Sequence, residues 1–156
     1  MTERIKILNE RLEEAFGQLP VPAPETIVYD SSGEHLECLQ VAEVFRGRHW
    51  LDINTDELMR ERDALAFFSP EGFRFYLPAF ARFALLDFDE ADLIPMVIVW
   101  SLGRFEDYAR RRIALFDNAQ RAVLADCVAF IAEQAPDDFT PEEIDRAISN
   151  LKQDTP

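Results

Sequence analysis

The sequence predicts an all-α, or nearly all-α, single domain: a helical bundle of about six helices around a kinked, aromatic-rich central helix. Apolar residues recur at spacings of three and four along most of the chain, which is the helical period. Several of these segments open with a capping residue followed three positions later by Glu or Gln, and the connections between them are short. The 156 residues, 48 % of them hydrophobic, suit one domain with one core, residues 1–156.

The first helix is expected over residues 3–16, where apolar side chains fall on one face. Thr2 can cap its start, and Gly17 lies where a helix-ending glycine belongs. A proline-rich connector, residues 19–25, must then be extended, because proline lacks an N–H and restricts the residue before it. Residues 26–29 could form a short strand or simply line the core.

The second helix is expected to open at a capping box formed by Ser31 and Glu34. It would continue to about Arg46, with Leu36 and Leu39 among its buried residues.

Asn54 and Glu57 form the next capping signature and open a short helix. Ser69, followed by proline and glutamate, opens the central helix, which carries a dense aromatic stripe. Pro78 interrupts that stripe and removes one backbone hydrogen bond, so we expect a kink or a break there.

In the C-terminal half, residues 93–102 are apolar on almost every side and must be buried, but their pattern fits a helix or a strand. Asp89 can cap the element that follows it. Asp117, with Gln120, opens a long helix to about Gln134. An acidic C-terminal helix is expected at about residues 141–151.

The charge balance narrows the classes of partner. The chain has 30 acidic and 16 basic side chains, a net charge of −14. Such a surface repels nucleic acids and anionic membranes, so we expect neither, whereas a basic protein partner remains open. No apolar run is long enough to cross a bilayer and no signal peptide is visible, so we expect a cytoplasmic protein. Cys38 and Cys127 are expected to be reduced thiols.

No set of residues typical of catalysis or metal binding stands out. His35 and Cys38 lie one helical turn apart, but no further Cys or His pair exists to complete a zinc site, so packing roles are the simpler interpretation. Phosphate-binding loops, nucleophile elbows and Glu-x-x-His pairs are absent. We therefore expect no cofactor, no metal and no enzyme activity, and carboxylate-based chemistry, with or without a metal, remains an alternative.

Two acidic stretches contain no basic residue and are the candidate partner-binding residues, because their field would attract a basic surface. The alternative is that several of them only stabilise helix starts. They are Asp87, Asp89, Glu90, Asp92, Glu133, Asp137, Asp138, Glu142, Glu143 and Asp145. The run Arg110–Arg112 is the opposite feature; it could neutralise the acidic surface or bind an anion.

The centre of the chain carries a distinctive block, SPEGFRFYLPA, at Ser69–Ala79, preceded by Trp50. It resembles a family of small, acidic bacterial proteins of unknown function. The resemblance implies a structural role for the block and an accessory or immunity-type protein. The residues concerned are Trp50, Pro70, Glu71, Phe73, Tyr76, Leu77 and Pro78.

We therefore expect a non-enzymatic acidic binding protein, such as an immunity or antitoxin-like inhibitor of a basic protein. A structural module or homodimer without a ligand is the remaining alternative. An exposed apolar patch around Phe75, Phe83 or Phe88 would favour it. The chain would be a monomer or a homodimer.

Overall fold

The computed structural model describes residues 1–153, and within that range its regular structure is helical throughout, with no strand. The α-helices and short 3-10 helices (η) are α1 (Glu3–Phe16), η1 (Pro24–Thr26), α2 (Leu36–Phe45), η2 (Trp50–Asp52), α3 (Thr55–Arg60), η3 (Arg62–Ala66), α4 (Pro70–Leu86), α5 (Ile94–Gly103), α6 (Glu106–Ile113), α7 (Asn118–Gln134) and α8 (Pro141–Lys152).

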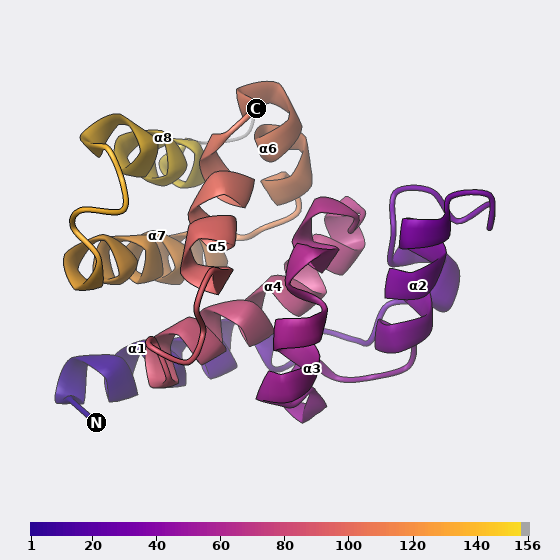
Figure 1. Ribbon diagram of the computed structural model, residues 1–156, viewed down its shortest axis with the longest axis horizontal. Coiled ribbons are helices and arrows are strands. Elements are labelled where there is room, and N and C mark those ends of the chain that lie inside the picture. Colours follow the sequence, from indigo (N-terminus) through magenta and orange to yellow (C-terminus); the bar gives the residue numbers. More distant parts are fainter. Residues whose placement is uncertain (154–156) are drawn as a thin grey trace.

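Helix α4 crosses the middle of the molecule and contacts α1, α5, α6 and α7 (Figure 1). Its start is fixed by Ser69, whose hydroxyl accepts a hydrogen bond of 3.0 Å from the Gly72 N–H. The helix continues through Pro78 to Leu86, so of the expected kink or break the break is excluded. Proline removes only one hydrogen bond, and burial of this helix on nearly every side compensates for that loss.

Helices α5, α7 and α8 pack against one another on one side of α4, and α1 lies along α7 and α4 (Figure 1). The α5–α8 contact is close, because a Cβ added at Gly103 would lie 3.2 Å from the backbone nitrogen of Ala147. Asn150 of α8 is buried and donates a hydrogen bond of 2.9 Å to the carbonyl of Leu102 in α5. The apolar segment at residues 93–102 is therefore helical from Ile94 onward and packed on most of its surface, whereas Leu93 precedes the helix and is exposed.

The capping boxes expected at Asn54 and Asp117 are confirmed, each with both reciprocal hydrogen bonds. Thr140 forms a third capping box, with Glu143, at the start of α8. The capping box expected at Ser31 is wrong. Gly33 has a φ of 85°, a left-handed conformation that cannot belong to an α-helix.

Helix α2 starts instead at Leu36, and the Nδ1 of His35 accepts from the Cys38 N–H at 3.2 Å. The expected burial of Leu36 and Leu39 is also wrong, since they are 78 % and 43 % exposed. Helix α2 buries the opposite face and lies at the side of the molecule away from α8 (Figure 1).

The expected number of about six helices is too low, since the described residues form eight α-helices. Helix α6 has no conventional apolar face: its buried positions are Ala109, Arg112 and Ile113, so an arginine stands where the pattern requires an apolar residue. Asp89 caps no helix, because α5 starts at Ile94 without a side-chain cap. Of residues 26–29, Thr26 ends η1, and Val28 forms an isolated bridge with Phe68.

Candidate functional site

The ten acidic residues that the sequence singles out are all on the surface, except that Glu143 is half-buried. Glu143 accepts a hydrogen bond of 3.1 Å from the indole N–H of Trp100. Its pKa is lowered, first by the backbone hydrogen bond from Thr140 and then by Trp100. Glu133 forms an ion pair with Arg4 of α1. These two carboxylates therefore already have partners within the fold.

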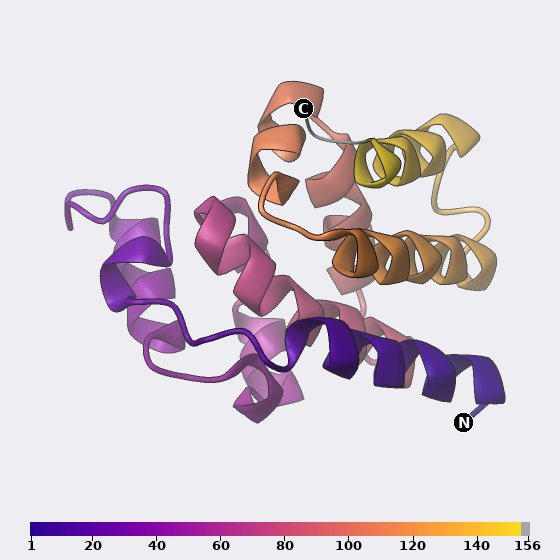
Figure 2. The ribbon, with the colours of Figure 1, turned by 180° about the vertical axis from the view of Figure 1, so that it is seen from behind.

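The other eight carboxylates belong to the α4–α5 connection and to the α7–α8 connection with the first turns of α8, which lie in the same half of the molecule as the start of α1 (Figures 1 and 2). Phe88 of the first connection contacts Phe130 of α7, with ring centroids 6.4 Å apart. None of the eight forms an ion pair with another residue of the 1–153 range. We call this group the acidic end: Asp87, Asp89, Glu90, Asp92, Asp137, Asp138, Glu142 and Asp145.

A hollow of about 490 Å³ lies elsewhere, between α2, η3, α5 and α6. We call it the aromatic groove. Its lining is mainly apolar, and it includes Phe67, Trp100, Phe105, Tyr108, Arg104 and Arg112, with Glu37 and Asp63 as acidic members. A volume of this order is typical of small-molecule sites.

Arg112 is the unusual residue of the aromatic groove. It is only 4 % exposed. Its guanidinium carbon lies 3.9 Å from the ring centroid of Phe73 and 5.2 Å from that of Tyr108. Nη2 donates to the carbonyl of Leu65, while the buried Nε has no partner. Burial lowers the pKa of Arg112 to about 10, so the group stays charged at neutral pH.

Two more side chains, those of Arg104 and Phe105, line the aromatic groove at its rim. The guanidinium carbon of Arg104 lies 3.9 Å from the ring centroid of Trp100. Phe105 is 81 % exposed and has a left-handed backbone, with φ 53° and ψ 67°. Arg104 and Phe105 are not among the candidate residues predicted from the sequence. The sequence does contain a signal for this site: Trp100, Arg104, Tyr108 and Arg112 follow one another at intervals of four residues. Aromatic and cationic side chains alternate at these positions.

The arginine run at 110–112 has three different environments. Arg110 forms an ion pair with Glu106, 2.6 Å apart, and Arg111 is exposed near the Tyr108 ring. Only Arg112 reaches the aromatic groove.

The block at Ser69–Ala79 has a core role, apart from the exposed Glu71 and the partly exposed Pro70 and Arg74 at its start. The Tyr76 hydroxyl lies 2.7 Å from the Phe45 carbonyl and 2.9 Å from that of Arg48. Burial raises the pKa of Tyr76 to about 12. Trp50 donates to the Phe16 carbonyl at 3.1 Å, which joins η2 to the end of α1. These bonds hold α1, α2 and η2 in fixed positions around α4.

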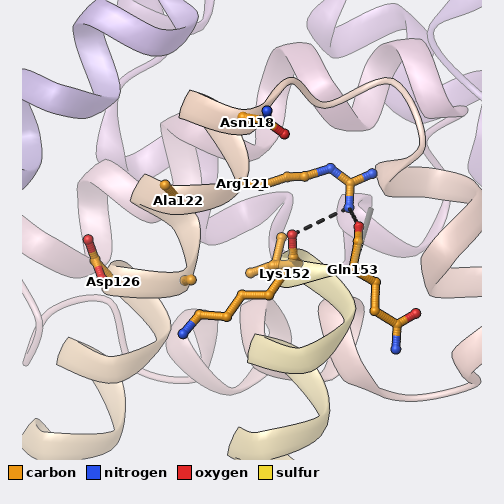
Figure 3. A pocket seen from close by; sticks show the side chains of 8 residues that line it. Asn118, Arg121, Ala122, Asp126, Lys152 and Gln153 are labelled. Atoms are coloured by element: carbon orange, nitrogen blue, oxygen red, sulfur yellow. Dashed lines mark hydrogen bonds between the residues drawn. The ribbon is translucent and has the colours of Figure 1, made fainter. Parts of the chain in front are cut away.

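A second hollow, of about 240 Å³, lies between α7 and α8 beside Arg121 (Figure 3). The guanidinium of Arg121 is buried and donates to carbonyls at the ends of two helices. The acceptors are those of Ile113, Phe116, Asn150, Leu151 and Gln153. Figure 3 shows the side chain crossing to the end of α8, and we assign it a structural role.

Metal binding and reactive-cysteine chemistry have little support in the described part of the chain. No group of three or more His, Cys, Asp or Glu side chains is arranged to hold a metal ion there. Burial raises the pKa of the Cys127 thiol to about 12, which keeps it protonated and unreactive. No helix among these residues has the length and apolar character needed to cross a membrane.

The comparisons with known proteins agree with the resemblance at the level of the family. No curated protein and no solved structure matches the chain significantly. A family model, described as a family of unknown function (DUF6714), matches residues 11–153, which is nearly the whole chain. The chain therefore belongs to this family of unknown function.

Proposed function

We propose that the chain is a non-enzymatic binding protein whose acidic end receives a basic protein, in the manner of a bacterial immunity or antitoxin-like inhibitor. The observation that carries the proposal is the group of eight exposed carboxylates without an ion pair at the acidic end. Four of these carboxylates belong to the α4–α5 connection. The other four belong to the α7–α8 connection and the first two turns of α8.

Their effect on a partner follows from electrostatics. Like charges held close together and uncompensated create a negative potential that speeds encounter with a cationic surface. Salt screens such exposed charges, with a Debye length of about 8 Å at physiological ionic strength. Binding should therefore weaken as salt rises, and the association rate should change more than the dissociation rate.

The test is a pull-down from the native host at low salt and then at high salt, with captured proteins identified by mass spectrometry. The variant is Asp89→Asn/Asp137→Asn/Asp138→Asn, at the acidic end. The control is Glu25→Gln/Glu34→Gln/Glu43→Gln, three exposed acids near α2, at the other side of the molecule. Both change the net charge by three.

We expect a basic protein that the wild type and the control retain at low salt and that the acidic-end variant loses. Retention of no basic protein at low salt, or an equal loss of that protein by both variants, would contradict the proposal.

Self-association has one specific observation in its favour. The expected patch at Phe75 and Phe83 is wrong, because both side chains are buried, at 2 % and 4 % exposure, and Phe88 is half-buried. Exposed apolar residues lie instead around α2, with Tyr29 at 52 % and Leu36 at 78 % exposure. Light scattering at two protein concentrations, repeated with Leu36→Ser, would detect a dimer formed through this surface.

A carboxylate-based enzyme has weaker support. The carboxyl pKa values that are clearly shifted, those of Asp30, Glu57 and Glu143, are all lowered. A carboxyl group that acts as a general acid near neutral pH needs a raised pKa.

A further inference from the structure

We propose that the aromatic groove is a binding site for a small aromatic anion, a flat conjugated ring system that carries a carboxylate or a similar group. This inference is independent of the acidic end, because the groove lies between α2, η3, α5 and α6. It rests on three separate features: a buried guanidinium without a counter-ion, aromatic walls, and an exposed aromatic residue held in a strained backbone conformation.

Arg112 supplies the binding group for the anion. A buried charge is costly unless an opposite charge or several hydrogen bonds compensate for it. Among residues 1–153, Arg112 has no carboxylate partner; it has one carbonyl acceptor and two aromatic rings, and its buried Nε is unpaired. The fold therefore leaves guanidinium N–H groups available at the wall of a hollow. An anionic oxygen is the acceptor that matches them best.

The aromatic side chains supply a surface for a flat ring. Phe67, Trp100, Phe105 and Tyr108 all line the groove. Aromatic rings favour offset-stacked and edge-to-face contacts with one another. These contacts give a flat aromatic ligand more binding free energy than the burial of its apolar surface alone. Arg104 already lies over the Trp100 ring and brings a second positive charge to the same wall.

Phe105 is the residue hardest to explain by folding. A bulky residue with positive φ is strained, and strain of this kind persists where the surrounding structure imposes it, often at binding sites. Here the strained residue buries almost nothing, since it is 81 % exposed. The left-handed turn between α5 and α6 keeps the ring at the rim of the groove, where it can cover a bound ligand.

The charges around the groove set the orientation of the ligand. Arg104 directly follows α5 and Arg112 belongs to α6, whereas Glu37 and Asp63 belong to α2 and η3. An anionic group is attracted to the first wall and repelled by the second. The ring system of the ligand then lies toward Phe67 and the α2 side.

The test uses 2-naphthoate as the probe and 2-naphthamide, which has nearly the same shape but no charge, as its control. The chain contains two tryptophans, Trp50 and Trp100, so a ¹⁵N-labelled sample gives two indole N–H signals. Trp50 is buried away from the groove and serves as an internal reference. We expect 2-naphthoate to shift the Trp100 signal, assigned with Trp100→Phe, and to leave the Trp50 signal in place. A saturable Kd between about 10 μM and 1 mM is typical of a ligand of this size.

The variants separate the anion site from the aromatic surface. Arg112→Gln should weaken 2-naphthoate binding about tenfold and leave 2-naphthamide within about twofold, because only the first ligand makes the charge-assisted hydrogen bond. Arg110→Gln, on the same helix but outside the groove, is its control. Phe105→Ala should weaken both ligands about threefold or more, and Leu115→Ala should change neither. Circular dichroism checks that each variant is folded.

Four results would overturn the proposal: no saturable shift of Trp100, equal shifts of both indoles, equal affinity for naphthoate and naphthamide, or unchanged binding in Phe105→Ala. The last variant keeps the test decisive even if Arg112→Gln does not fold, because Phe105 is exposed. A peptide with a C-terminal phenylalanine that binds at least about tenfold more tightly than 2-naphthoate would assign the groove to a protein partner instead.

Discussion

The substitution Gly72→Ala tests how closely the start of α4 approaches the segment that follows the proline-rich connector. A Cβ at position 72 would lie 2.0 Å from the carbonyl oxygen of Ile27 and 2.9 Å from its carbonyl carbon. A relaxed carbon–oxygen contact is about 3.3 Å or longer, so the two backbones must separate by about 1 Å. Ser69 anchors this region, because its N–H donates to the same Ile27 carbonyl at 2.9 Å.

The expected magnitude follows from three contributions. Overpacking of a buried site costs about 1–3 kcal/mol. Weakening the hydrogen bond from Ser69 to Ile27 costs about 1 kcal/mol more. The higher helix propensity of alanine returns about 1 kcal/mol. Gly72→Ala should therefore lower the free energy of unfolding by about 1–3 kcal/mol, although helix propensity alone predicts that it stabilises the protein.

Urea unfolding followed by circular dichroism measures this difference. Gly103→Ala is a milder variant for comparison. Its added Cβ would lie 3.2 Å from the nearest atom, so the free energy of unfolding should fall by about 1 kcal/mol. Stability equal to or above that of the wild type in Gly72→Ala would show that the close approach at Ile27 is not real. A larger loss at Gly103 than at Gly72 would contradict the distance argument.

Three further predictions concern the core, the pH dependence of stability and the central helix. Trp50→Ala and Tyr76→Ala should each lower the free energy of unfolding by about 3–5 kcal/mol, because both side chains are fully buried; a loss below about 1 kcal/mol would contradict that burial. Glu57→Gln should remove about 1 kcal/mol at pH 7, a value reduced by solvent screening of this partly exposed pair. The hydrogen bond from Arg48 lowers the pKa of Glu57 to about 2 from an ordinary 4.5, so the contribution is complete above pH 4.5 and is lost as the pH falls toward 2. Unfolding of wild type and variant at pH 7 and pH 2.5 should show the gap closing, and a constant gap would refute the assignment. Pro78→Ala should leave binding of any partner captured by the wild type unchanged, since Pro78 is buried inside α4; reduced capture by a folded variant would show a direct role.

Local signals in the sequence were sufficient where a helix start depends on one side chain and the backbone three residues on. Asn54, Asp117 and Thr140 are such cases. The same signal failed at Ser31, because the left-handed Gly33 decides the conformation there and the pattern of polar residues does not show it. Helix α6 was not predicted because Arg112, stacked on Phe73, occupies a core position where the helical pattern requires an apolar residue.

The two surface features required the three-dimensional structure for a different reason. The acidic end depends on the contact between Phe88 and Phe130, which are 42 positions apart in the numbering. The aromatic groove combines four elements from about half of the chain's length, and no local period links Phe67 to Trp100. The acidic residues and the arginine run could be identified from residue type alone. The residues that lie next to them are determined by tertiary packing and could not be predicted from local sequence.

The contacts of Arg121 have a consequence for how the protein opens. This single side chain on α7 holds the last turn of α8 and the end of α6, through the carbonyls of Asn150, Leu151, Gln153 and Ile113. A C-terminal helix ordinarily frays first in native-state hydrogen exchange. Here its detachment would remove several acceptors from a buried guanidinium at once. The amides of α8 should therefore exchange together with those of α7, as one cooperative unit, and at a rate set by global rather than local unfolding.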